Sequence, residues 1–95
     1  MIKDFKDKLT ERIFNQDSCK ELSKDVQKVA LRKLIMLDCA ENLSDLKVPP
    51  GNRLELLSGD RKGQYSIRVN DKYRLVFTPI DGGKNFKDVQ IIDYH

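Results

Sequence analysis

The sequence predicts a single α+β domain over residues 1–95, in which two N-terminal helices pack on one face of a small, mainly antiparallel sheet. Three observations support this fold class. Apolar residues recur at helical spacing in two segments within the first 40 positions. Two prolines and a glycine between Val48 and Asn52 exclude both helix and central strand. From Arg53 onward apolar and polar residues alternate, so helices come first and a strand meander follows, which should leave one sheet face free.

The first helix is predicted over about Asp7 to Asn15. Leu9 and Ile13 lie at helical spacing there, with charged residues between them. The segment that follows, up to Ser18, is rich in residues that prefer caps and turns. Met1 to Phe5, ahead of this helix, could form an edge strand.

The second helix is predicted from about Ser23, a favourable N-cap, to Cys39 or Ala40. Its apolar stripe consists of Val26, Val29, Ala30, Leu34 and Leu37. Leu31, Ile35 and Met36 widen the apolar surface, so we expect the helix to contact both the sheet and the first helix. The alternative is a groove for a partner protein.

The strands are predicted from the alternation of side chains. Arg53 to Leu57 places Leu54 and Leu56 on one face and Glu55 on the other. Gly59 to Gly63 is a basic loop, and after Pro79 a turn leads to a last strand over Lys87 to Asp93, as the order of turn residues and apolar residues indicates.

A hairpin over residues 65–77 is the clearest β element. If Asp71 is the centre of a three-residue loop, its inner face is wholly apolar, because Val69 faces Tyr73, Ile67 faces Leu75 and Tyr65 faces Phe77. The same register sets Arg68 opposite Arg74 on the outer face. Like charges directly opposite each other are unfavourable, so either a phosphate lies between the two guanidinium groups or they point apart into water.

The distribution of charge indicates a polyanionic partner. Between Arg53 and Arg74 there are six basic and three acidic residues, which accounts for the whole net charge of +3. Nucleic acid is favoured over a membrane surface. Two cysteines without a CxxC pattern fit a reducing compartment, and no apolar run is typical of a signal peptide or membrane span. These observations predict a cytoplasmic protein.

RNA cleavage requires cations around the phosphate, a base and an acid. Glu55, Tyr94 and His95 are the available acid–base side chains. A histidine at the end of the chain is more often a frayed terminus than a catalyst. The acidic residues are scattered, which argues against a metal site, and no phosphate-binding GxxxxGK[ST] motif or other cofactor motif occurs.

Five segments carry a resemblance to a known family: Met1 to Phe5, Pro49 to Glu55, Gly59 to Asp71, Tyr73-Arg74, and Ile92 to His95. On these segments the chain resembles the HigB toxins of the RelE/ParE superfamily of bacterial toxin–antitoxin systems. It looks especially like the GraT-type members, which share the Pro-Pro-Gly-Asn-Arg-Leu-Glu run.

The resemblance implies a ribosome-dependent mRNA endoribonuclease, or interferase, that cleaves the codon in the ribosomal A site through 2′-hydroxyl attack, without metal or cofactor. It implies a HigA-type helix-turn-helix antitoxin as partner, with operator DNA bound only through the complex. Arg68 and Arg74 would stabilise the scissile phosphate, and Asp93, Tyr94 and His95 would supply orientation and acid–base chemistry. The expected RNA contacts are Arg53, Arg61, Lys62, Asn70 and Lys72.

The chain departs from some HigB toxins, which have histidine at the position of Glu55 and often lysine at that of Ser58. A carboxylate base, or weaker activity, is therefore expected here. His95, next to its own terminal carboxylate, should act as the acid or as a phosphate stabiliser. The rival hypotheses are a ParE-like gyrase inhibitor and a catalytically weak module that binds RNA or antitoxin.

Overall fold

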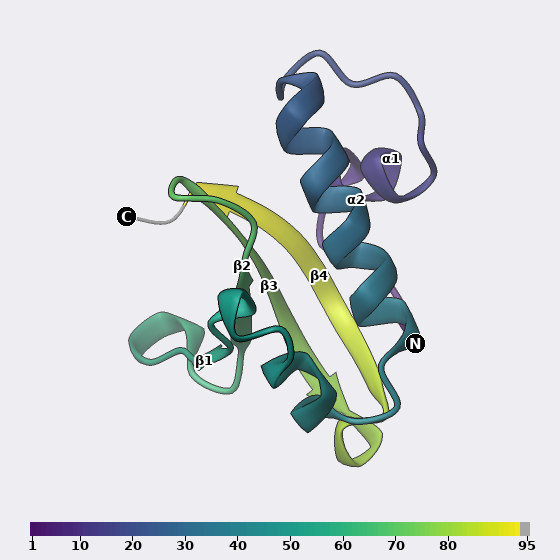
Figure 1. Ribbon diagram of the computed structural model, residues 1–95. Helices are drawn as coiled ribbons and strands as arrows, with labels where there is room; N and C mark the ends of the chain where they lie inside the picture. The colour runs from purple at the N-terminus through teal and green to yellow at the C-terminus, as the bar shows by residue number, and fades with distance from the viewer. Residues whose placement is uncertain (94–95) are drawn as a thin grey trace.

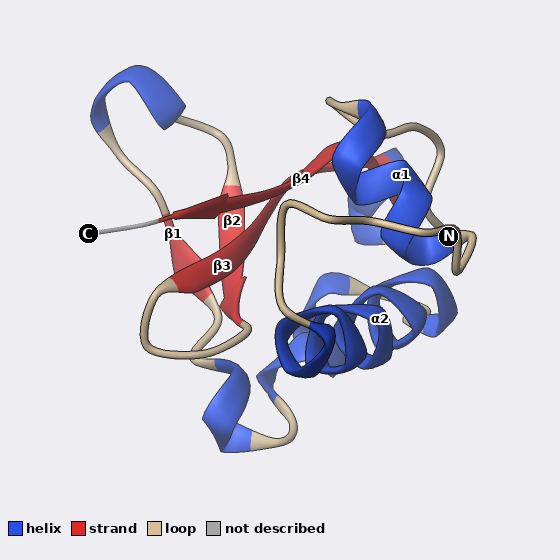
Figure 2. Ribbon diagram, turned by 90° about the horizontal axis from the view of Figure 1, so that it is seen from above, coloured by secondary structure: helices blue, strands red, loops and turns tan. Residues whose placement is uncertain are grey.

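The predicted fold class is confirmed by the computed structural model, which describes residues 1–93. Helices α1 and α2 lie together on one side of a four-stranded antiparallel sheet with the order β1-β2-β3-β4 (Figures 1 and 2). The elements are α1 (Lys8–Phe14), α2 (Lys24–Cys39), β1 (Glu55–Leu56), β2 (Tyr65–Arg68), β3 (Tyr73–Ile80) and β4 (Asn85–Asp93), with short 3-10 helices η1 (Leu43–Lys47), η2 (Pro50–Asn52), η3 (Gly59–Arg61) and η4 (Asp81–Gly83). No helix within these residues is long and apolar enough to cross a membrane.

Both helices begin at capping residues. The Asp7 carboxylate accepts a hydrogen bond from the backbone N–H of Thr10 at 2.9 Å, and the Ser23 hydroxyl accepts one from Val26 at 3.2 Å. Each cap satisfies one of the backbone donors that a helix start leaves unpaired. The predicted cap at Ser23 is therefore confirmed, and both helix ranges agree with the sequence to within one or two residues.

The main core lies between the helices and the inner face of the sheet. The α2 residues Ala30, Leu34 and Leu37 are fully buried there. From the sheet, Phe77 and Phe86 meet edge to face, with ring centroids 5.3 Å apart. That geometry is the favoured one for an aromatic pair, because the ring edge of one meets the π face of the other.

Thr10 joins α1 to β4 through a buried hydrogen bond. Its Oγ1 accepts from the backbone N–H of Ile91 at 2.9 Å, and Thr10 is fully buried. Thr10→Val keeps the shape but leaves that N–H unpaired, so it should lower the free energy of unfolding by about 1–3 kcal/mol. Urea denaturation measures this loss, and Thr10→Ser, which keeps the hydroxyl, is the control. A valine variant as stable as the parent would contradict the prediction.

The N-terminal segment lies along β4 but is not a strand. Two isolated parallel bridges join Ile2 to Phe86 and Phe5 to Val89, and the Lys3 N–H donates to the Phe86 carbonyl at 2.8 Å. The predicted edge strand is thus reduced to two points of contact. The segment nevertheless covers part of the outer edge of β4, which would otherwise expose unpaired backbone groups.

The predicted strand over Arg53 to Leu57 contains only Glu55 and Leu56, because Arg53 adopts a left-handed conformation with φ of 46°. Leu56 is 64% exposed, whereas Leu57 is 6% exposed. The prediction that the outer face of the sheet is free is wrong for part of that face. Ser66 and Val76 are fully buried there, and they alternate with the inward Ile67, Leu75 and Phe77. Leu57 and Val76 are buried outside the main core.

Candidate active site

A polar hollow opens at one end of the outer sheet face. Its volume is about 260 Å³, and we call it the arginine hollow, defined by Arg53, Glu55, Arg68, Asn70, Asp71 and Arg74. These residues come from β1 and the segment that leads into it, from β2 and β3, and from the turn between these two strands. The structure thus brings together five residues that the sequence nominated separately, and it adds Asp71.

Arg74 is the most firmly held cation in the hollow. Its Nε donates to Ser66 Oγ at 2.8 Å, and its Nη2 donates to the backbone carbonyl of Arg53 at 2.5 Å. Nη2 also lies 4.0 Å from Glu55 Oε2, and the side chain is only 12% exposed. The guanidinium plane is therefore fixed by acceptors from two neighbouring segments before any ligand arrives, which reduces the cost of binding.

The predicted register is confirmed, since Arg68 pairs with Arg74, Ile67 with Leu75 and Tyr65 with Phe77. The two opposing arginines turn to different acceptors within the protein. Arg68 Nη2 forms an ion pair with Asp71 Oδ1 at 2.5 Å, while Arg74 uses the separate partners described above. Each charge has its own acceptors, so repulsion between the arginines does not by itself require an anion.

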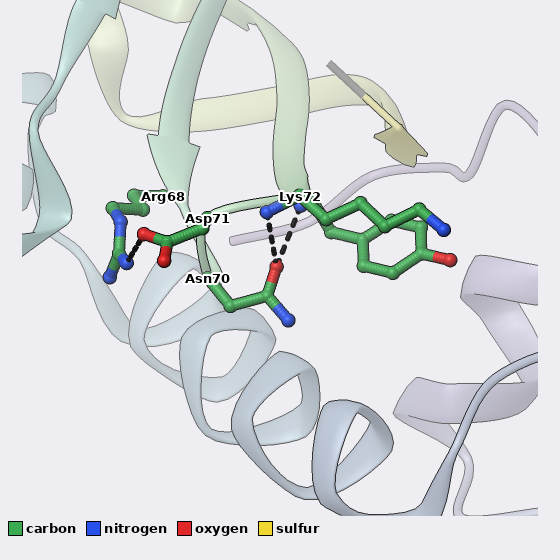
Figure 3. A network of polar contacts seen from close by, with 5 residues as sticks. Arg68, Asn70, Asp71 and Lys72 are labelled. Carbon is green, nitrogen blue, oxygen red and sulfur yellow. Dashed lines mark hydrogen bonds and ion pairs between the residues drawn. The ribbon is translucent and has the colours of Figure 1, made fainter. Parts of the chain in front are cut away.

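The hairpin turn depends on Asn70 (Figure 3). Its Oδ1 accepts from the backbone N–H groups of Lys72 and Tyr73 at 2.8 and 2.7 Å, which fixes the three-residue loop. Figure 3 shows Arg68 and Lys72 extending to opposite sides of this turn. The Lys72 ammonium lies 5.4 Å from the centre of the Tyr73 ring and 3.8 Å from Asp93 Oδ2, and Lys72 does not line the arginine hollow.

Arg61 and Lys62 lie in a different place from the arginine hollow. They line a second hollow of about 620 Å³, here called the lysine hollow, together with Lys6, Asp60, Gln64, Thr78, Lys87, Asp88 and Gln90. Arg61 Nη1 donates to Gln64 Oε1 at 3.3 Å. Four cations and two carboxylates line this hollow, so it is net positive. Gln90 pairs with Val76, which shares a face with Arg74, so both hollows open away from the helices.

The last described residue, Asp93, pairs with Tyr73 at the start of β3, next to Arg74. The described chain therefore ends at the same end of the sheet as the arginine hollow. Tyr94 and His95, which the sequence nominated for acid–base chemistry, lie outside the described residues. Among residues 1–93, no three histidine, cysteine, aspartate or glutamate side chains gather in a way that could hold a metal ion.

Sequence reasoning missed Ser66, Asp71 and the carbonyl of Arg53 as partners of the two arginines. Ser66 carried a usable signal, because it stands two residues before Arg68 and so shares its strand face. Asp71 was noticed only as the centre of the turn. The carbonyl contact has no signal in the sequence, since Arg53 and Arg74 are 21 residues apart.

Two helices on one side of a four-stranded antiparallel meander, with clustered arginines on the other, define a small α+β domain. Two structures of the YoeB–YefM toxin–antitoxin complex from Staphylococcus aureus have this fold. They match with TM-scores of 0.60 and 0.57 at 24% and 23% identity, each covering 100% of this chain and 95% of theirs. At this identity the likeness concerns the fold alone.

The family is shown by closer matches in sequence. The profile of the "RelE-like toxin of type II toxin-antitoxin system HigB" matches residues 3–95. Toxin HigB-1 of Vibrio cholerae serotype O1 is 46% identical over 83 residues, which cover 86% of this chain and 87% of that toxin. The chain therefore belongs to the HigB family of RelE-like toxins of type II toxin–antitoxin systems. Toxins of this family are ribosome-dependent endoribonucleases.

Proposed function

We propose that this chain cleaves mRNA in the ribosomal A site without a metal ion. In the proposed reaction a ribose 2′-oxygen forms a bond to the adjacent phosphorus, and the bond from phosphorus to the 5′-oxygen breaks. The 2′-hydroxyl proton goes to a base, and the leaving 5′-oxygen takes a proton from an acid. The products are a 2′,3′-cyclic phosphate and a 5′-hydroxyl. The observation that carries the proposal is the fixed, largely buried guanidinium of Arg74 beside the hollow.

Charge stabilisation is the first role we assign. The contacts of Arg74 within residues 1–93 use Nε and Nη2, so Nη1 remains to meet a phosphate oxygen. Arg68 lies directly across the strand pair and supplies a second cation. Guanidinium groups held in place before the reaction stabilise the additional negative charge of the transition state without reorganising.

Proton transfer is the second role. Glu55 lines the arginine hollow, is 53% exposed and lies close to Arg74. We assign its carboxylate as the base. We assign His95 as the acid or as a phosphate stabiliser, with Asp93 and Tyr94 orienting the reacting groups. These assignments extend the family resemblance of the closing Asp-Tyr-His, and the end of β4 beside Arg74 supports them.

RNA binding is the third role, and it uses both hollows. We propose that Arg53 and Asn70 contact the cleaved codon at the arginine hollow. Arg61 and Lys62 contact RNA backbone, of the message or of the ribosome, at the lysine hollow, and Lys72 contacts it beside the turn. Such backbone contacts are electrostatic and weaken as salt concentration rises.

As the toxin of a type II system, the chain is expected to have an antitoxin. We propose a HigA-type helix-turn-helix protein, with operator DNA bound only by the complex. Cleavage on ribosomes would take place in the cytoplasm. The YoeB toxins in the two structural matches are likewise bound to an antitoxin, YefM.

Primer extension on a defined mRNA in a translating extract tests the proposed function. The intact protein should produce cuts inside codons that disappear when ribosomes are withheld, and His95→Ala should remove them. Arrested synthesis without cuts would mean that the chain binds without cleaving. Intact mRNA with DNA damage in cells would instead indicate gyrase inhibition.

A substitution of Asp71 should strengthen the binding of ribosomes rather than weaken it. The Asp71 side chain is 99% exposed and forms an ion pair with Arg68, so it competes with RNA phosphate for that guanidinium. Asp71→Asn removes the competing carboxylate, so we expect KM for programmed ribosomes to fall by about 2-fold to 5-fold, the size of an exposed ion pair. The effect should shrink at high salt. Steady-state cleavage at two salt concentrations measures it, and Glu41→Gln, which removes a negative charge from an exposed residue outside both hollows, is the control.

A further inference from the structure

One lysine of helix α2 is buried. Lys33 of α2 is only 7% exposed, and its Nζ donates a hydrogen bond to Oδ1 of Asn52, which is fully buried. Burial lowers the pKa of Lys33, and the nearby Arg32 and Arg68 guanidinium groups lower it further. A cation in such a place is unfavourable unless it has a specific partner, and Asn52 provides that partner.

Asn52 is held on several sides. Its Nδ2 lies 3.1 Å from the Leu46 carbonyl, 3.4 Å from the Val48 carbonyl and 3.1 Å from Met36 Sδ. Its backbone N–H donates to the Pro49 carbonyl at 2.9 Å. The side-chain amide of Asn52, the last residue of η2, thus joins that segment to α2, to η1 and to the Val48 carbonyl.

The next residue, Arg53, connects Asn52 to the arginine hollow. Arg53 has φ of 46° and ψ of 57°, a left-handed conformation that non-glycine residues adopt only when their surroundings enforce it. In that conformation its carbonyl accepts from Arg74 Nη2. A continuous series of contacts therefore runs from Lys33 through Asn52 and the backbone of Arg53 to the guanidinium of Arg74.

We infer that Lys33 and Asn52 are positioning residues for Arg74: their buried hydrogen bond holds the Arg53 carbonyl where it orients the phosphate-binding guanidinium. Neither residue touches the RNA. The inference rests on the proposed function, because Arg74 acts in the proposed cleavage. Ser66 accepts from Nε through its hydroxyl, but its backbone carbonyl lies 3.4 Å from Nη2 and is the weaker acceptor there. Loss of the Arg53 carbonyl would therefore leave the Nη2 end of the guanidinium poorly held.

The test uses Asn52→Ala and Lys33→Met in the full chain. Lys28→Met is the matched control, because Lys28 is an exposed lysine of the same helix and its loss removes the same charge. Two kinds of measurement are made: the kinetics of cleavage on programmed ribosomes, which give kcat and KM, and the 15N–1H signals of the Arg74 Nη2 group, which donates to the Arg53 carbonyl. Folding of each variant is checked by circular dichroism.

Both variants should lower kcat by about 10-fold to 100-fold, the effect of a reacting group displaced by about 1 Å, and should leave KM within about 2-fold. In both, the Arg74 Nη2 protons should lose their restrained, separate signals, move toward those of an exposed arginine and exchange faster with water, because Nη2 is the group that donates to the Arg53 carbonyl. Lys28→Met should change neither quantity. This split between kcat and KM would not follow from a general loss of stability.

An unchanged Arg74 signal in a folded variant would overturn the inference, and so would an unchanged kcat. If the parent protein cleaves no mRNA, the proposed function fails, while the Arg74 signal still decides whether the two residues position it. Should Asn52→Ala not fold, Lys33→Met and Asn52→Asp decide. The aspartate keeps the acceptor for Lys33 but loses the Nδ2 donors. This variant should therefore keep part of the parent's kcat and part of its Arg74 signal.

Discussion

Replacing Arg74 by alanine should lower the rate of mRNA cleavage on ribosomes by about 10²-fold to 10³-fold, the usual cost of removing one fixed donor from a site of developing charge. The expectation follows from how the side chain is held. Ser66 Oγ and the Arg53 carbonyl fix it, and it is 12% exposed, so its charge is less screened than that of a surface arginine. Single-turnover cleavage of an mRNA with a defined A-site codon measures the effect.

Arg74→Lys separates charge from geometry. A lysine keeps the positive charge, but a single ammonium cannot bond both acceptors and still present a second pair of donors to phosphate. This variant should therefore remain close to Arg74→Ala in rate. Arg61→Ala removes an arginine from the lysine hollow and should act mainly on KM. If Arg74→Ala kept a rate within about 3-fold of the parent while binding ribosomes normally, Arg74 would have no role in charge stabilisation.

The hairpin could be predicted from the sequence because two requirements agreed on one register. Burying Ile67, Leu75 and Phe77 on the same face permits no shift by one residue, and Asn70 and Asp71 mark the turn. The register then placed Arg68 opposite Arg74 without any further assumption. The helices were predictable for a similar reason, since cap residues and apolar spacing pointed to the same ends.

The short β1 strand was harder to predict because its side chains are divided between two buried surfaces. Alternation assigned Leu54 and Leu56 to the core, and Leu54 does pack there. Leu56, however, stands at the exposed edge of the sheet, whereas Leu57 is buried on the outer face. Three leucines within four residues do not show which of the two sheet faces is covered, because the segment that covers it is itself irregular.

The internal organisation of the site depends on contacts between residues that are distant in sequence. Lys33 and Asn52 are 19 residues apart and join a helix to a loop, so no local pattern predicts that this lysine is buried. The sequence shows the excess of basic residues from Arg53 to Arg74, but the fold divides them between the arginine hollow and the lysine hollow and leaves Lys72 outside both. Charge counts predict a polyanionic partner, and only the fold assigns each cation to a place.

The chemistry of the substrate provides the sharpest test of the mechanism. Replacing the 2′-hydroxyl at the cleaved position by hydrogen or by a methoxy group should reduce cleavage to background, because the proposed nucleophile is then absent. The same substitution one nucleotide further along the codon should leave the rate within about 3-fold, since it affects only contacts to the sugar. Primer extension on mRNAs made with one modified nucleotide measures both.

This substrate test also separates the proposed reaction from hydrolysis by an activated water molecule. A water nucleophile does not need the neighbouring 2′-hydroxyl, so an enzyme of that kind would still cut the 2′-deoxy position. The ends of the products give an independent answer, because attack by the 2′-oxygen leaves a 2′,3′-cyclic phosphate and attack by water leaves a linear one. Cleavage of the 2′-deoxy mRNA at the parental rate would contradict the mechanism proposed for Arg74 and Glu55, although the chain would remain a toxin of the HigB family.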